Sequence, residues 1–366
     1  MAPETRVAIV HDFMETYGGA ERVTAEMAKA FPAAPVVAIL GRRSVAERMG
    51  VGDRFRSILP PRDALLRHYR LLTPVLGALA DAQRLPAADV VLSSSYAFAH
   101  RLRSENDAPR VCYCHSPLRF AWSMTDSYRE ERARGRLAGR AFDLLAAGVR
   151  RSDRRSAQEI RSYLTQSPFT AEQIERFYGR RAEVIGAPVD CNLFHPSPDP
   201  AGDYYLFCGR LIEPYKRVGI VIEAFRRTGQ RLIVAGTGPD AQRLAASAPA
   251  NVEFVGQVGD DRLVPLMQGC RALVFPSRDD FGLIPVEVMA CGRPVLAYAG
   301  GGSLYTSVPG VTGELFPEQT AAAVEAALRG FDSDAYDPER IRAHAVQWDS
   351  AEFRARLVHA VAAVDA

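Results

Sequence analysis

The sequence predicts an α/β protein made of two doubly wound domains, and three observations support this fold class. Short apolar strands alternate with helices along the chain, the alternation stops at a proline-rich segment, and it then starts again. The length of 366 residues also exceeds the size at which one hydrophobic core usually stops growing. With 48% hydrophobic and 24% charged residues, the composition excludes a disordered chain. We expect a ligand cleft between the domains, at the carboxyl ends of their strands.

The first expected domain covers residues 1–187 and begins with a buried strand over 6–10. A glycine turn leads into a helix over 19–31, where Val23, Met27 and Phe31 recur every four residues. The later strands are short continuous apolar runs, which is typical of parallel strands buried on both faces. Strands are expected over 36–40, 90–93, 111–114 and 184–185, with helices across 128–162 and over 170–178.

Four prolines between residues 187 and 202 disfavour both helix and central strand, so we expect a linker over 188–203. The second domain is expected over 204–345. The tail is expected to be helical from residue 321, and its last helix, within 346–366, is expected to pack back toward the first domain. Strands are expected over 204–208, 232–235, 252–255, 273–275 and 294–297, with helices over 218–225, 241–246, 263–267 and 283–290.

The formal net charge of +2 conceals two halves of opposite sign. Residues 1–190 carry 29 basic and 22 acidic side chains, whereas 191–366 carry 16 and 21. Lys29 and Lys216 are the only lysines among 45 basic residues. The six cysteines lie mostly in apolar runs, and no export signal is recognisable, so we expect reduced thiols and a cytoplasmic protein, with peripheral attachment to the inner face of the membrane as the alternative.

Three segments carry residues suited to phosphate or polar ligands. Gly18-Gly19-Ala20-Glu21 opens the first helix, where glycines allow close backbone approach and the helix end attracts anions; it matches a tight turn equally well. Arg210 follows a strand and Lys216 begins a helix, a pairing that suits a diphosphate, although a solvated basic turn is nearly as good an interpretation. The chain contains no GxGxxG or P-loop pattern.

The third segment runs from Asp279 to Glu287. Asp279 comes just before a predicted helix, whose free backbone N–H groups would point toward a ligand. Glu287 lies eight residues later among apolar neighbours, where an unpartnered carboxylate is costly to bury. An acidic helix cap with an unrelated buried glutamate is the alternative interpretation.

The chain resembles the retaining GT-B glycosyltransferases of family GT4 over nearly its whole length. The matching motifs occur in the family's order, and they are Gly18-Gly19-Ala20-Glu21, the Gly209-Arg210 to Lys216 run ending at Phe225, Gly236-Thr237-Gly238-Pro239, Asn251 to Gly256, and Phe281-Gly282-Leu283 through Val295. Within that family, His11-Asp12, the segment from Cys114 to Trp122, and Pro214 to Val218 look most like the bacterial mannosyltransferases that use GDP-mannose. The resemblance implies two Rossmann-like domains.

The same resemblance implies roles for individual residues. Arg210 and Lys216 would hold the donor diphosphate, Asp279 the donor sugar, Glu287 the ribose, and His115 would lie near the transferred sugar. The other implied donor-binding residues are Gly18, Gly19, Gly209, Val258, Asp280, Phe281, Gly282 and Leu283, and Asp12 would face the acceptor. Two residues depart from the family pattern: Asp279 replaces the usual glutamate, and Tyr305 stands where glutamate is common.

The implied reaction transfers a hexose, with mannose from GDP-mannose as the first choice, to a hydroxyl of a lipid-linked or saccharide acceptor. No cofactor and no metal are expected, and Asp332-Ser333-Asp334 is interpreted as a surface loop. Residues 129–155 hold nine arginines against four carboxylates, which suits either a solvated helix pair or an anionic membrane surface. Nucleic-acid binding is not expected. The rival hypotheses are a glycosyltransferase of secondary metabolism that acts on small molecules and a catalytically silent binding or scaffold subunit.

Overall fold

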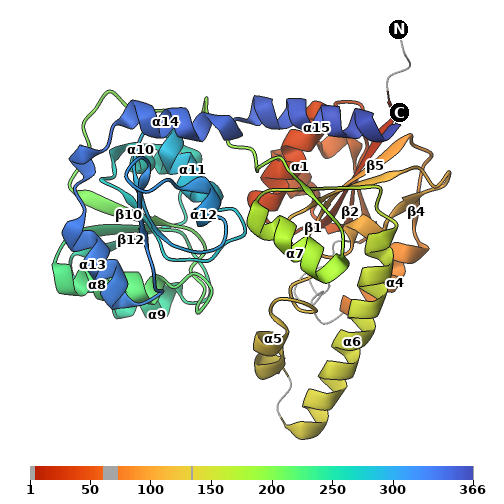
Figure 1. Cartoon of the computed structure of the whole chain (residues 1–366), viewed down its shortest axis with the longest axis horizontal. Coiled ribbons are helices and arrows are strands. Elements are labelled where there is room, and N and C mark those ends of the chain that lie inside the picture. The colour runs from red at the N-terminus through yellow and green to blue at the C-terminus, as the bar shows by residue number, and fades with distance from the viewer. Residues whose placement is uncertain (1–4, 61–72, 133–134, 366) are drawn as a thin grey trace. The chain divides into compact units, whose positions relative to one another are not determined.

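The computed structural model describes residues 5–60, 73–132 and 135–365, and the chain divides into two compact units (Figure 1). Unit 1 contains residues 1–187 and 353–366, and unit 2 contains residues 188–352. The segment 188–203, expected as a linker, therefore belongs to unit 2. There the Val189 N–H donates to the Trp348 carbonyl, and the Arg342 guanidinium donates to the carbonyls of Cys191 and Phe194.

Unit 1 is built on a seven-stranded sheet with the order β3-β2-β1-β5-β7-β8-β9, in which every pair of neighbours is parallel. A small second sheet pairs β4 with β6. The strands are β1 Val7–Met14, β2 Val36–Gly41, β3 Phe55–Leu59, β4 Arg84–Leu85, β5 Val90–Ser95, β6 Arg103–Ser104, β7 Arg110–Cys114, β8 Ser162–Thr165 and β9 Glu183–Val184. The helices are α1 Gly19–Ala30, α2 Arg43–Arg48, α4 Thr73–Ala82, α5 Thr125–Arg132, α6 Arg136–Gln158 and α7 Pro168–Tyr178, with short 3₁₀ turns η1 Gly52–Arg54 and η3 Ala99–Arg101.

Unit 2 contains a six-stranded parallel sheet with the order β12-β11-β10-β13-β14-β15. Its strands are β10 Tyr204–Cys208, β11 Arg231–Ala235, β12 Val252–Gly256, β13 Leu273–Phe275, β14 Val295–Tyr298 and β15 Gly313–Phe316. Its helices are α8 Val218–Thr228, α9 Ala241–Ala246, α10 Asp260–Gly269, α11 Leu283–Ala290, α12 Ser303–Thr306, α13 Ala321–Gly330 and α14 Pro338–Ala345, with 3₁₀ turns η4 Ser333–Ala335 and η5 Val346–Trp348. The prediction of two doubly wound α/β domains is confirmed.

Several strands differ from the sequence-based expectation. β1 continues to Met14 instead of ending at Val10, because the polar side chains of His11 and Asp12 find hydrogen-bond partners inside the unit. β3, β8 and β15 were not expected. β8 has only two apolar residues, and the buried Thr165 at its end is accommodated by donating its hydroxyl to the Cys114 carbonyl.

The last helix, α15 Ser350–Asp365, enters unit 1 at Phe353. The Phe353 ring packs edge to face on Tyr113, with 5.7 Å between the ring centroids. Arg354 pairs with Glu26 of α1, and Arg356 donates to the Val184 carbonyl. These contacts fasten the end of the chain to unit 1.

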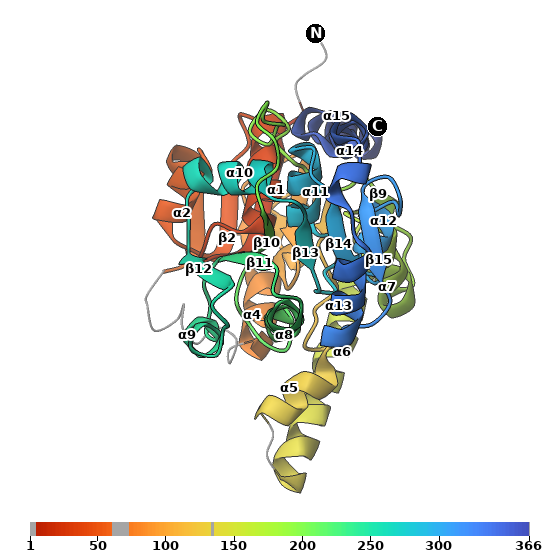
Figure 2. The ribbon, with the colours of Figure 1, turned by 90° about the vertical axis from the view of Figure 1, so that its left-hand side faces the viewer.

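Helices α5 and α6 extend beyond the sheet of unit 1 in both views (Figure 1 and Figure 2). α6 is 23 residues long, and its deeply buried side chains lie between Ala146 and Ala157. No helix among residues 5–60, 73–132 and 135–365 is long and apolar enough to cross a membrane.

Candidate functional site

In unit 2, glycine turns follow the carboxyl ends of the first three strands. Gly209 follows β10, Gly236 follows β11 and Gly256 ends β12, each with a positive φ. A Cβ atom at Gly236 would lie 1.9 Å from the carbonyl oxygen of Gly209, so only glycine lets these two turns meet. The edge of the sheet therefore presents closely packed backbone, as expected where ligands bind to open α/β sheets.

The loop between β10 and α8 is held by two carboxylates. Asp240 Oδ2 accepts the Glu213 N–H at 2.8 Å, and Glu213 Oε1 accepts the Gly219 N–H at the start of α8, also at 2.8 Å. Lys216 lies between these anchors, and its own N–H donates to the Ile212 carbonyl. The position of the Lys216 side chain is thus set by its loop.

Lys216 and Asp279 meet, although 63 residues separate them in the chain. The Lys216 Nζ lies 2.5 Å from Asp279 Oδ2, and both side chains are largely buried. The ammonium group also lies 5.2 Å from the Tyr215 ring centroid and 5.7 Å from that of Phe275. The other carboxylate oxygen, Asp279 Oδ1, is buried and has no hydrogen-bond partner among the described residues. This atom is placed to accept a hydrogen bond from a ligand.

A second glycine turn, at Gly302, fixes the backbone of Asp279. The Gly302 N–H donates to the Asp279 carbonyl at 2.8 Å, and a Cβ at Gly302 would lie 2.3 Å from the Phe281 Cα. The Phe281 side chain is buried against Trp348 and Tyr305. Phe281 therefore offers a ligand only its backbone.

The other unit 2 residues that the sequence placed at the donor site lie in the loops after β10 and β12, in α11 and in the segment that leads into it. Arg210 is exposed, and its guanidinium forms no ion pair or side-chain hydrogen bond with any described residue. Gly282 has φ +87 and precedes α11, whose first residue is Leu283. Glu287 is buried in α11, Val258 is half-buried after β12, and Asp280 is half-buried beside Asp279. Unit 2 brings together Lys216 and Asp279, with Arg210 on the same edge.

In unit 1 the Gly18-Gly19 turn leads into α1. The Gly18 N–H donates to Glu21 Oε2 at 2.9 Å, so this amide is already used within the helix cap. Gly19 is exposed at the first position of the helix. Of the two glycines expected near donor phosphates, only Gly19 leaves its backbone open to a ligand.

His115 follows β7, and its ring is buried between aromatic neighbours. The ring centroid lies 5.2 Å from that of Tyr113 and 6.2 Å from that of Tyr96. His115 Nε2 is 2.8 Å from the Ser94 hydroxyl. Burial lowers the pKa of His115 to about 3, and repulsion from His11 adds to the shift, so the ring is neutral near pH 7.

Asp12 has a different environment from the acceptor contact that was expected. Its side chain is fully buried, Oδ2 accepts the N–H groups of Tyr96 and Ala97, and Oδ1 accepts those of Phe98 and Ala99. The four distances are 2.6–2.8 Å. The structure thus assigns Asp12 to holding the turn after β5, because the carboxylate is saturated by backbone donors.

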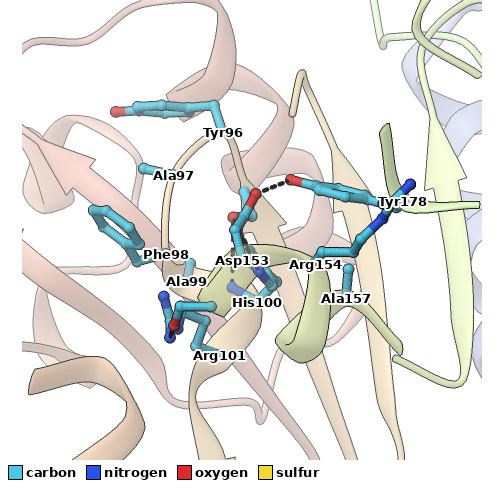
Figure 3. Close-up of polar contacts among 12 residues, drawn as sticks. Tyr96, Ala97, Phe98, Ala99, His100, Arg101, Asp153, Arg154, Ala157 and Tyr178 are labelled. Atoms are coloured by element: carbon cyan, nitrogen blue, oxygen red, sulfur yellow. Dashed lines mark hydrogen bonds and ion pairs between the residues drawn. The ribbon is translucent and has the colours of Figure 1, made fainter. Parts of the chain in front are cut away.

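A second buried carboxylate, Asp153, joins α6 to the same turn (Figure 3). Asp153 Oδ2 accepts from Trp122 Nε1 at 2.7 Å and from the Tyr178 hydroxyl at 2.8 Å, and Oδ1 lies 3.5 Å from His100 Nε2. Burial by itself lowers the pKa of His100, but the hydrogen bond and charge of Asp153 outweigh it, and the pKa is raised. His100 and Asp153 form a buried pair that anchors α6 to the sheet.

Two family profiles match the chain, one on each side of residue 200. The profile described as Glycosyltransferase Family 4 matches residues 17–193, and the one described as Glycosyl transferases group 1 matches residues 202–333. In structure, the chain resembles Anabaena Alr3699/HepE, solved in complex with UDP and glucose, with a TM-score of 0.71 at 18% identity, covering 98% of this chain and 100% of that one. The chain is of the GT4 type, with a GT-B fold.

Curated relatives of this GT4-type chain match over part of their length. D-rhamnosyltransferase WbpZ of Pseudomonas aeruginosa is 31% identical over 160 residues, which is 42% of each protein. D-inositol 3-phosphate glycosyltransferase of Mycobacterium avium is 34% identical over 157 residues, or 37% of each. The matched region thus spans about two fifths of these relatives.

The GT4-type chain also contains functional candidates that the sequence did not single out. They are Ser94, His100 and Asp153, each fully or almost fully buried in unit 1. The sequence feature that could have identified such residues is a polar side chain inside an apolar strand or on the apolar side of a helix. Among the described residues there is no group of three or more His, Cys, Asp or Glu side chains arranged to hold a metal ion.

Proposed function

We propose that this protein transfers a hexose from a nucleotide diphosphate sugar to an acceptor hydroxyl, with retention at the anomeric carbon. The observation that carries the proposal is the Lys216–Asp279 pair beside the unpaired Arg210, on the carboxyl edge of the unit 2 sheet. An ammonium and a guanidinium suit a diphosphate, and the buried Asp279 Oδ1 suits a sugar hydroxyl as hydrogen-bond donor.

In the proposed reaction the acceptor oxygen bonds to the anomeric carbon while the bond from that carbon to the diphosphate oxygen breaks. The acceptor proton passes to the departing diphosphate, so no separate protein base is needed. Lys216 and Arg210 stabilise the negative charge that grows on the leaving group. The 2.5 Å contact between Lys216 and Asp279 fixes the position of the ammonium before the donor binds. The entropy lost in ordering this side chain on donor binding is therefore small.

For the donor we propose GDP-mannose, on the basis of the finer resemblance carried by His11-Asp12, the Cys114 to Trp122 segment and Pro214 to Val218. Val258 and Glu287 are the proposed contacts to the base and ribose. Because the structural neighbour Alr3699/HepE was solved in complex with UDP and glucose, and also with UDP-glucose, UDP-glucose is the competing donor to test.

The experiment combines binding and product analysis. Calorimetry with GDP and UDP identifies the base, and NMR of the product formed from GDP-mannose or UDP-glucose gives the anomeric configuration. We expect tighter binding of GDP and a product with the donor's α configuration. A β product would overturn the retaining mechanism, and absence of transfer or hydrolysis with every nucleotide sugar would favour a silent binding subunit.

For the acceptor we propose a lipid-linked saccharide, approached by α6 lying on an anionic membrane surface. Leu137, Leu144 and Leu145 are 82%, 75% and 43% exposed. Leu137 and Leu144 are seven residues apart and lie on one face of α6, roughly opposite the buried Asp153, whereas Leu145 lies beside Val149. Exposed arginines accompany them along the helix, namely Arg140, Arg151, Arg154 and Arg155. The Arg129–Asp143 ion pair removes one nearby negative charge. Leucines flanked by arginines match an anionic lipid headgroup layer.

Co-sedimentation of the full chain with vesicles tests this contact. We expect binding to vesicles that contain phosphatidylglycerol, and weak binding to phosphatidylcholine alone. The double variant Leu137→Ser/Leu144→Ser should lose most of the binding, whereas Leu304→Ser, which changes a 62% exposed leucine in unit 2, should retain it. Equal loss in both variants would contradict the assignment, and transfer to soluble acceptors without vesicle binding would favour the small-molecule hypothesis.

A further inference from the structure

Trp348 is buried near the end of unit 2, and the proposed chemistry does not use it. The ring centroids of His344, Tyr305 and Phe281 lie 5.1, 5.7 and 5.9 Å from that of Trp348, each in edge-to-face geometry. Aromatic rings in this arrangement attract one another and fix their relative orientation. We refer to these four residues of unit 2 as the aromatic cluster. The indole thus joins α14, α12 and the turn before α11.

The backbone at Trp348 is fixed by hydrogen bonds to the first residues of unit 2. The Trp348 carbonyl accepts the Val189 N–H at 2.9 Å, and the Val189 carbonyl accepts the Ser350 N–H, also at 2.9 Å. The Asp349 carboxylate accepts the Cys191 N–H at 3.2 Å. Because the chain on either side of the indole is held in this way, the position of the ring is determined by the fold of unit 2.

Helix α12, which carries Tyr305, is held between α14 and the donor-site loop. His344 Nε2 donates to the Thr306 carbonyl at 3.0 Å, since a carbonyl oxygen can only accept. Just before α12, the Gly302 N–H donates to the Asp279 carbonyl at 2.8 Å. The aromatic cluster is therefore connected to the backbone of Asp279 through α12 as well as through Phe281.

Phe281 transmits this packing to the groups that we propose for the donor sugar. Phe281 stands two residues after Asp279, whose buried Oδ1 has no hydrogen-bond partner among the described residues. The next residue, Gly282, has φ +87 and no side chain to limit its backbone conformation. The first N–H groups of α11 have no acceptor within the helix. The orientation of Asp279 and of these N–H groups thus depends on the buried Phe281 ring.

We propose that Trp348 is a positioning residue of the donor site, which acts through Phe281 to hold Asp279 and the start of α11 in the geometry that receives the transferred sugar. The ligand class is the hexose of a nucleotide diphosphate sugar. The diphosphate is assigned to Arg210 and Lys216, which lie outside the aromatic cluster in the loop between β10 and α8. The inference rests on the proposed glycosyl transfer for its ligand, whereas the hold on residues 279–286 is a property of the free protein.

Trp348→Leu is the first test, because it removes the indole and leaves an apolar side chain. Phe331→Leu is the matched control, since Phe331 is also buried in unit 2 but packs on Tyr205 at the start of β10 and on Tyr336. Hydrogen exchange of the full chain without ligand, measured by mass spectrometry, reports how firmly residues 279–286 are held. We expect exchange in this segment to be about fivefold faster in Trp348→Leu and unchanged in Phe331→Leu. Equal exchange in the wild type and Trp348→Leu would overturn the proposal.

The wild type provides a second measurement. The chain has two tryptophans, Trp122 in unit 1 and Trp348 in unit 2, so labelling with ¹⁵N-tryptophan gives two indole signals, which the variant Trp348→Phe assigns. With GDP-mannose or UDP-glucose, whichever binds in calorimetry, we expect the Trp348 signal to shift further than with GDP or UDP alone, while the Trp122 signal stays in place. A bound nucleotide sugar that shifts Trp348 no further than the nucleoside diphosphate would contradict the assignment.

Steady-state kinetics separates positioning from general packing. We expect kcat to fall about tenfold in Trp348→Leu, with the affinity for GDP within about twofold of the wild type, and Trp348→Phe to recover most of the activity. Phe331→Leu should keep a kcat near that of the wild type. Equal losses of kcat in the two leucine variants would assign the effect to weaker packing of unit 2 and overturn the positioning role.

The measurements also distinguish failure of this inference from failure of the proposed function. If the wild type neither binds nor transfers a nucleotide sugar, the proposed function fails, and hydrogen exchange of the free protein still decides whether Trp348 holds residues 279–286. If Trp348→Leu does not fold, the wild-type indole titration and the activity of Trp348→Phe decide.

Discussion

The two units place polar groups at the carboxyl edges of their sheets in opposite ways. In unit 1, Asp12 receives four backbone donors and the Ser94 hydroxyl contacts two histidines, so these oxygen atoms have partners within the unit. In unit 2, Asp279 Oδ1 is buried without a partner and Arg210 is unpaired, both with respect to the described part of the chain. Unit 1 is preorganised by its own side chains, whereas unit 2 retains groups for a charged ligand. Changes to Lys216 in unit 2 should therefore affect function most, whereas changes to Asp12 in unit 1 should affect stability most.

The largest expected effect comes from Lys216→Ala. Removing the ammonium takes away a charge that stabilises the departing diphosphate, and we expect kcat/KM for transfer to fall by about 100- to 1000-fold. The melting temperature should change little, because the loop is held by Asp240 and Glu213. Arg217→Ala, one residue along, is the control and should keep most of the activity. Full activity in Lys216→Ala would contradict the donor site.

Asp12→Ala should destabilise unit 1 strongly. Four backbone N–H groups lose their acceptor in a fully buried place, and we expect the free energy of unfolding to fall by about 3 kcal/mol or more. Urea denaturation measures this change, with the exposed Asp107→Ala as the control. If Asp12→Ala instead kept the stability of the wild type and lost acceptor binding, the hypothesis that Asp12 contacts the acceptor would be supported.

Glu287→Ala is expected to weaken binding of the nucleoside diphosphate by about tenfold, through loss of a charged hydrogen bond to the ribose. Calorimetry measures the affinity, and a 2′-deoxynucleotide provides the matching change on the ligand. If the deoxynucleotide loses the same affinity in the wild type and in Glu287→Ala, the glutamate does not contact that hydroxyl.

The smallest effect concerns pH. Because Asp153 raises the pKa of His100 in the folded protein, this pair stabilises unit 1 fully below the unfolded histidine pKa near 6.5, and the contribution is lost as pH rises through the folded value. The difference in unfolding free energy between the wild type and His100→Gln should therefore shrink as pH increases from about 6 to 9. A difference that stays constant across this range would show that the pair is not ionised.

The sequence predicted the strands and helices that have a clear local pattern of apolar residues. It did not predict contacts between residues that lie far apart in the chain. Short apolar runs located β10, β13 and α11 closely, because buried parallel strands need continuous apolar segments. β8 was missed, since Ser162 and Thr165 lack that pattern and Thr165 is buried only through a hydrogen bond to β7. Lys216 stood out by its rarity, but its contact with Asp279 depends on two loops brought together by the sheet. The four hydrogen bonds to the Asp12 carboxylate could not be predicted from the sequence, because their donors are backbone amides and not side chains.

The rarity of lysine gives the Lys216–Asp279 contact a practical consequence. An amine-selective acylating reagent can modify two side chains in this protein, the exposed Lys29 of α1 and the mostly buried Lys216. Lys29 would serve as an internal standard for reagent strength, while the labelling rate at Lys216 would report whether its ammonium is covered. Mass spectrometry of the labelled wild-type protein can thus follow occupancy of the donor site, by comparing the labelling rate at Lys216 with that at Lys29.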